Sequence, residues 1–151
     1  MIETRVYLDT TVPSAILDNR ASDRRQLTER FWQETLPGLS PVISVVVLAE
    51  IRETTDDMKR SEMEKLVTGF EVLPFTEEAD SLARAYVNRG VFPEKYLSDA
   101  THVAIAVVNG ISYLVSWNFR HLVKVRTRRE VNLINAIMNY GQIEIIAPPE
   151  L

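Results

Sequence analysis

Short runs of β-branched and aromatic residues alternate with segments of helical periodicity along this chain. The runs that predict strands are residues 4–8, 41–44, 71–74, 111–115 and 143–146. Apolar residues recur at helical spacing in the segments that begin near Val12, Asp23, Ser44, Lys59, Thr76, Ala100 and Thr127. Regular alternation of this kind is typical of proteins whose helices connect parallel strands. The sequence therefore predicts an α/β fold with a central, mostly parallel sheet flanked by helices.

Several of the predicted helices carry a recognisable start signal. A Ser, Thr or Asp before a helix can accept the free N–H groups of its first turn. The predicted caps are Ser44, Thr76, and either Ser98 or Asp99, while residues 23–26 and 127–130 have the form of a capping box. The helix at residues 100–108 is apolar nearly all round, which predicts a central, buried position.

Composition limits the class of protein. At 151 residues the chain is expected to form one domain, residues 1–151. Its apolar runs are too short to span a bilayer and its first residues do not resemble a signal peptide, so we expect a cytoplasmic protein without membrane contact. There is no cysteine, so any metal must be held by oxygen atoms or by the two histidines, His102 and His121.

The formal net charge of −4 argues against nucleic-acid binding by phosphate neutralisation alone. A nuclease is still compatible with this charge, because bound divalent cations can supply positive charge locally. Basic residues are also concentrated in one segment, residues 120–129. Within it, Arg120 and His121 are candidates for gripping phosphate. Arg128 and Arg129 lie at a predicted helix N-terminus, where they either face an external anion or form a solvated surface.

Acidic and amide side chains follow the predicted strands at one edge of the sheet. Strand ends and helix starts share that edge in a right-handed parallel sheet, so these side chains are expected to converge. Crowded carboxylates repel one another unless a cation lies between them, and hard oxygen ligands suit Mg²⁺ or Mn²⁺. The residues concerned are Asp9, Glu50, Asp99 and Asn118.

Each of these residues also has a structural interpretation. Asp9 and Asp99 are suited to cap helices, Glu50 to lie on a solvated helix face, and Asn118 to form a turn. His102, three residues after Asp99, either contacts the site or is a packed histidine bonded to a carbonyl. Both interpretations stay open at this point.

Four motifs, in order and spacing, resemble the PIN domain family, which includes the VapC-type toxin ribonucleases of bacterial toxin–antitoxin pairs. They are Val6-Tyr7-Leu8-Asp9-Thr10-Thr11, Leu48-Ala49-Glu50-Ile51, the segment from Leu97 to Ala106, and Leu114-Val115-Ser116-Trp117-Asn118-Phe119. The resemblance covers nearly the whole chain and implies a three-layer α/β/α fold. It also implies that Asp9, Glu50 and Asp99 bind metal, with Asn118 at a fourth position that is often Asp.

The resemblance further implies hydrolysis of RNA with Mg²⁺ or Mn²⁺, leaving a 5′-phosphate and a 3′-hydroxyl. Thr11 and Ser116 would support the acids by hydrogen bonds, and Thr10 is an alternative to them. A cognate antitoxin protein and a homodimer are the implied partners. The neutral Asn118 puts a second tightly bound metal ion in question.

Two other classes of protein do not fit these residues. A haloacid-dehalogenase-type phosphatase needs a second Asp where Thr11 stands, and a response-regulator receiver needs paired acids and a late lysine, so both are rejected. The remaining alternative is a PIN scaffold without turnover that binds protein or RNA.

Overall fold

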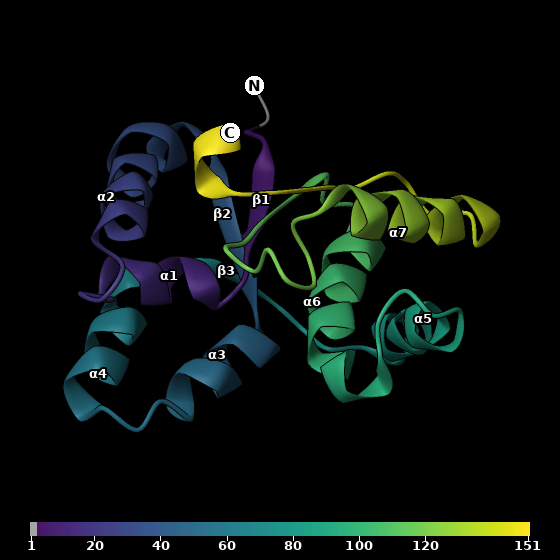
Figure 1. Ribbon diagram of the computed structural model, residues 1–151, viewed down its shortest axis with the longest axis horizontal. Coiled ribbons are helices and arrows are strands. Elements are labelled where there is room, and N and C mark those ends of the chain that lie inside the picture. Colours follow the sequence, from purple (N-terminus) through teal and green to yellow (C-terminus); the bar gives the residue numbers. More distant parts are fainter. Residues whose placement is uncertain (1–2) are drawn as a thin grey trace.

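A five-stranded parallel sheet forms the centre of the molecule (Figure 1), in a computed structural model that describes residues 3–151. The strands are β1 (Arg5–Leu8), β2 (Ser40–Ser44), β3 (Glu71–Leu73), β4 (Tyr113–Val115) and β5 (Glu144–Ile146). All four neighbouring pairs are parallel. The predicted strands and the α/β class are therefore confirmed.

The strand order β3-β2-β1-β4-β5 places β1 in the middle. From β1 the chain first builds outward through β2 to β3, and then returns to the other side of β1 to add β4 and β5. Such a reversal opens a crevice at the carboxyl ends of the two strands where it occurs. Here those strands are β1 and β4, whose register pairs Leu8 with Val115.

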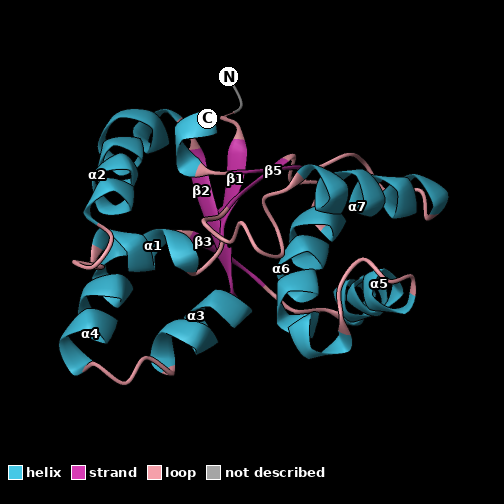
Figure 2. Ribbon diagram, viewed as in Figure 1, coloured by secondary structure: helices cyan, strands magenta, loops and turns pink. Residues whose placement is uncertain are grey.

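Helices cover both faces of the sheet, which gives the expected three layers. Figure 2 shows α1–α4 on one side of the strands and α5–α7 on the other. The first group is α1 (Thr11–Ile16), α2 (Ser22–Arg30), α3 (Val45–Arg52) and α4 (Asp57–Leu66), and the second is α5 (Glu77–Asn88), α6 (Leu97–Val108) and α7 (Val125–Ile137). Short helical turns follow α2, at Phe31–Thr35 and Leu36–Gly38, and precede α6, at Glu94–Tyr96.

The buried helix predicted at residues 100–108 is α6. Its residues from Ala100 to Val107 are all buried, and it packs closely against α5. The apolar surface all round this helix is thus explained by neighbours on both sides. None of the helices within residues 3–151 is long and apolar enough to cross a membrane.

Two predicted helix caps are confirmed. The Ser44 hydroxyl accepts the backbone N–H groups of Val46 and Val47, and the Thr76 hydroxyl accepts that of Ala79. In both cases the cap directly follows an extended segment, so the local pattern alone determines where the helix begins.

The other predicted caps are wrong. Helix α2 starts at Ser22, before the predicted capping box, and α7 starts at Val125. The Thr127 hydroxyl donates to the carbonyl of His121, so a contact with the preceding loop takes the group that a cap would need. Helix α6 starts at Leu97, because it continues directly from the turn Glu94–Tyr96. Ser98 and Asp99 therefore lie inside its first turn.

Candidate functional site

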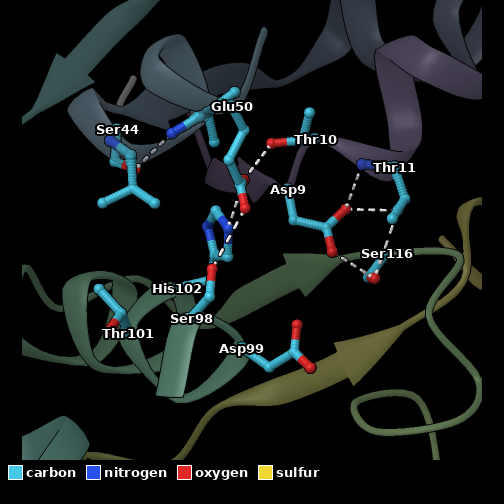
Figure 3. Close-up of polar contacts among 12 residues, drawn as sticks. Asp9, Thr10, Thr11, Ser44, Glu50, Ser98, Asp99, Thr101, His102 and Ser116 are labelled. Atoms are coloured by element: carbon cyan, nitrogen blue, oxygen red, sulfur yellow. Dashed lines mark hydrogen bonds and ion pairs between the residues drawn. The ribbon is translucent and has the colours of Figure 1, made fainter. Parts of the chain in front are cut away.

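Asp9 lies at the carboxyl end of β1 and is almost completely buried, at 3% exposure. Its Oδ1 accepts hydrogen bonds from the backbone N–H and the hydroxyl of Thr11, at 3.0 and 2.5 Å (Figure 3). Its Oδ2 accepts the Ser116 hydroxyl at 2.5 Å. Burial raises the pKa of this carboxyl, although the charge of His102 and the hydroxyl bonds act in the opposite direction. Asp9 therefore accepts a backbone N–H at the start of α1 and is also a buried acid.

Glu50 lies in α3 and points back toward the sheet edge. Its Oε1 accepts the Thr10 hydroxyl at 2.6 Å and lies 2.8 Å from Nε2 of His102. Its Oε2 accepts the Ser98 hydroxyl at 3.2 Å. Burial disfavours the charged acid, but the bonds from His102, Thr10 and Ser98 outweigh it and lower the pKa of Glu50. Glu50 is therefore held as a carboxylate and does not lie on a solvated helix face.

Asp99 and Asn118 face each other across the same edge. Asp99 is half-buried in the first turn of α6, and the Asn118 amide nitrogen donates to its Oδ1 at 3.4 Å. Burial raises the pKa of Asp99, against the charges of His121 and His102. The Asn118 amide oxygen accepts the backbone N–H of His121 at 2.9 Å. Asn118 therefore forms the turn that its position after a strand predicts, and it also contacts Asp99.

His102 is buried at 3% exposure and joins the site to the core. Its Nδ1 lies 2.7 Å from the Tyr7 hydroxyl, which in turn lies 2.7 Å from the Ser44 hydroxyl. Because a carboxylate only accepts, Nε2 donates to Glu50, while Nδ1 can either accept from Tyr7 or donate to it. Burial disfavours the imidazolium, yet Glu50, Asp9 and Asp99 together raise the pKa of His102.

The sequence pattern allows either a contact between His102 and the site or a packed histidine bonded to a carbonyl, and the second is the more usual. The partner is instead the carboxylate of Glu50, on another helix. The only local signal was a histidine three residues after Asp99 in an otherwise apolar helix. Tyr7 was read only as a strand residue and gave no signal of its own.

The basic residues divide into two groups. Arg120 and His121 line a hollow of about 280 Å³ together with Lys124 and Arg126, and the His121 ring stacks on Tyr96 at 3.7 Å between ring centres. Arg128 lies outside this lining, and its guanidinium donates to the carbonyl of Ile145 at 2.8 Å. Arg129 is exposed on α7. Of the four residues predicted to contact RNA, only Arg120 and His121 line the same hollow.

The donor set at this edge fits a hard divalent cation. Figure 3 shows the three acids around one region, with Glu50 above Asp9 and Asp99 below it. Within residues 3–151, no three acidic or histidine side chains come close enough to enclose a metal ion by themselves. Mg²⁺ usually keeps several of its waters and binds through one or two carboxylates, so a partly hydrated ion suits this arrangement. Burial raises the pKa of Asp9 and Asp99, and a bound cation would act against this shift by favouring their charged forms.

Comparisons with known proteins place the sequence in a family. Residues 6–125 match the PIN domain. No curated protein matches the sequence. The fold is similar to that of VapC20 from Mycobacterium tuberculosis, a sarcin-ricin loop cleaving toxin, with a TM-score of 0.60 and 21% identity over 77% of this chain and 92% of that chain.

Two complexes bound to DNA also share the fold. VapBC2 from Rickettsia felis has a TM-score of 0.56 and 12% identity over 95% of this chain and 98% of that chain. VapBC from Salmonella typhimurium has a TM-score of 0.55 and 16% identity over 96% of this chain and 98% of that chain. At these identities the likeness concerns the fold alone.

Proposed function

The chain belongs to the PIN domain family, and we propose that it is a metal-dependent endoribonuclease, the toxin of a type II toxin–antitoxin pair. The observation that carries the proposal is that Asp9, Glu50 and Asp99 lie around one region near the sheet edge where β1 and β4 end, although within residues 3–151 no three acidic or histidine side chains enclose a metal ion by themselves. Each acid is fixed by hydrogen bonds from neighbouring side chains. Acids on a solvated surface would be hydrogen-bonded by water and would not need these side-chain partners.

In this proposal Asp9, Glu50, Asp99 and the Asn118 amide oxygen bind Mg²⁺ or Mn²⁺, directly or through water. The bound ion would activate water and stabilise the charge that develops on the phosphodiester. The Asn118 oxygen accepts one hydrogen bond from His121 and keeps a second lone pair for a ligand. Because an amide is neutral, we propose one tightly bound ion.

The proposed reaction is hydrolysis, in which the bond from water oxygen to phosphorus forms and the bond from phosphorus to the 3′ oxygen breaks. Both Asp9 oxygens already accept hydroxyl bonds, from Thr11 and Ser116, which hold that carboxylate in place. The Oδ2 of Asp99 accepts no hydrogen bond from residues 3–151. We therefore assign to Asp99 the acceptance of the proton from the attacking water.

The proposed substrate contacts follow Asn118 in the chain. Arg120, His121 and Lys124 line one hollow next to the Asn118 turn and are suited to bind the phosphates that flank the cleaved bond. Arg128 and Arg129 are weaker candidates, because Arg128 is already bonded to a backbone carbonyl.

The proposed partner is an antitoxin protein. Two of the similar structures are VapBC complexes, which supports a partner of this kind. A homodimer is proposed from the family resemblance alone.

Asn118 supports a second candidate, a PIN scaffold that binds RNA or protein without turnover. Its amide nitrogen faces Asp99, and its oxygen is already engaged by His121. A site of this kind would bind a divalent ion weakly.

The test is cleavage of a structured RNA by the wild type, Asp9→Asn and Asp99→Asn, with Mg²⁺, with Mn²⁺ and with EDTA. We expect metal-dependent cleavage that both substitutions abolish. Cleavage that survives both substitutions would refute the assignment of the site. If the wild type cuts none of several RNAs and calorimetry detects no Mn²⁺ binding, the binding-module function replaces the nuclease.

A further inference from the structure

Two aromatic side chains flank Asn118 at the end of β4. The rings of Trp117 and Phe119 meet edge to face, with their centres 5.9 Å apart. Trp117 is 7% exposed, whereas Phe119 is 48% exposed. Phe119 is therefore a large apolar ring that is half exposed directly after Asn118, a residue of the candidate site.

Trp117 is fixed relative to the acids. Its backbone N–H donates to the Thr11 hydroxyl at 2.8 Å, and that hydroxyl in turn donates to Asp9. Its indole N–H donates to the buried Thr28 hydroxyl of α2, also at 2.8 Å. The aromatic pair is therefore held at a defined position beside the site rather than on a loose loop.

Arg24 of α2 lies over both rings. Its guanidinium carbon is 5.0 Å from the ring centre of Trp117 and 5.8 Å from that of Phe119. The guanidinium is exposed and forms no ion pair or hydrogen bond with residues 3–151, so its donors are available to a ligand. An open hollow of about 510 Å³ adjoins the guanidinium and is lined in part by Arg20, Asp23, Arg24 and Trp117.

A half-exposed aromatic ring beside a guanidinium that has no partner among residues 3–151 is suited to an unpaired nucleobase with its phosphate. The base stacks on the aromatic ring, and the guanidinium can pair with the phosphate or stack on the base. Because every base has a π-face, such stacking tolerates different sequences. A paired base would not reach the ring, since it is already stacked within its helix.

Resting on the proposed ribonuclease function, we propose that Phe119 and Arg24 form a nucleobase subsite, which holds one unpaired nucleotide of the RNA beside the cleaved phosphate. Arg120, His121 and Lys124, which line the other hollow, follow Phe119 within the next five positions of the chain. The two regions together would hold an extended single strand across the acids. The subsite predicts a preference for loops and unpaired segments over duplex RNA.

The test uses the Asp9→Asn protein, which should not cleave RNA, as the parent for further substitutions at positions 119 and 24. Fluorescence anisotropy measures how tightly each variant binds a short oligoadenylate. We expect Phe119→Ala to weaken binding about 5- to 150-fold and Phe119→Trp to restore it, because one base stack contributes about 1–3 kcal/mol. Arg24→Gln should also weaken binding. An oligomer of the same length without bases should bind Phe119→Ala and its parent equally.

Phe75→Ala is the matched control, because Phe75 is 43% exposed and follows the edge strand β3. It should bind oligoadenylate like its parent. Equal binding by Phe119→Ala and its parent would overturn the subsite, and so would equal losses in Phe119→Ala and Phe75→Ala. Failure of the ribonuclease itself is recognised separately, as an absence of metal-dependent cleavage by the wild type.

Discussion

At the scale of single residues, the site depends on small hydroxyl groups that orient the acids. Thr11 and Ser116 hold Asp9, and Thr10 holds Glu50, so the two threonines serve different acids instead of being alternatives. The sequence placed these hydroxyls next to the strand ends. It could not assign each to its acid, because the assignment depends on which rotamer reaches across the sheet edge.

His102 leads to a pH prediction at the same scale. Its raised pKa means that the folded protein holds this proton more tightly than the unfolded chain does, whose ordinary value is 6.5. The resulting stabilisation is complete below pH 6.5 and is lost as the pH rises through the folded-state pKa. In EDTA, the wild type should lose more unfolding free energy than His102→Gln between about pH 6 and about pH 8.5.

Urea denaturation of both proteins at the two pH values measures this difference. Asp9 and Asp99, whose pKa values are also raised, change stability in the same direction, and the His102 charge acts on the pKa of both. The difference between the two proteins therefore measures the titration of His102 together with its coupling to these acids. Parallel pH profiles for the two proteins would contradict the prediction.

At the scale of elements, two of the predicted caps lie where the sequence indicates, and the others do not. Ser44 and Thr76 cap their helices with their own hydroxyls. At α6, continuation from the preceding turn moves the start to Leu97, which puts Asp99 on the inner face of the first turn. The predicted cap is wrong because the helix continues through Ser98 and Asp99 from the turn Glu94–Tyr96 directly before it.

The two confirmed caps allow a matched prediction. Thr76→Ala should reduce the unfolding free energy by about 1 kcal/mol, the usual contribution of an N-cap. Ser44→Ala should reduce it by more, because the buried Tyr7 hydroxyl then loses a partner. Urea denaturation measures both, and equal losses would contradict the assigned role of Ser44. Thr76→Ala should leave Mn²⁺ affinity unchanged.

At the scale of the whole molecule, the sheet order brings together residues that are distant in sequence. Asp9 and Ser116 are 107 positions apart and share a hydrogen bond, because β1 and β4 are neighbours at the reversal of the strand order. This edge is where an open parallel sheet offers a binding crevice. The aromatic pair at Trp117 and Phe119 is held at the same edge through Thr11.

A metal site built from the whole fold should stabilise that fold. At the proposed site, Mn²⁺ would bind the native chain and not the separated acids of the unfolded one, so it should raise the melting temperature of the wild type. At about 100 times the dissociation constant the gain is about 2.7 kcal/mol. Asp9→Asn and Asp99→Asn should show a much smaller rise in a thermal-shift titration. An equal rise in all three proteins would place the bound ion elsewhere.

The sequence by itself determined the α/β class, the five strands, the buried helix and the approach of Asp9, Asp99 and Asn118 to one sheet edge. These features follow from residue periodicity and from the geometry of parallel sheets, which act locally or through general rules. Only the tertiary structure decided that His102 meets Glu50, that the Asn118 nitrogen faces Asp99, and that Arg24 covers Trp117 and Phe119. Contacts such as that of Glu50 and His102, 52 residues apart, leave no periodic trace in the sequence, because they depend on how separately formed elements pack together.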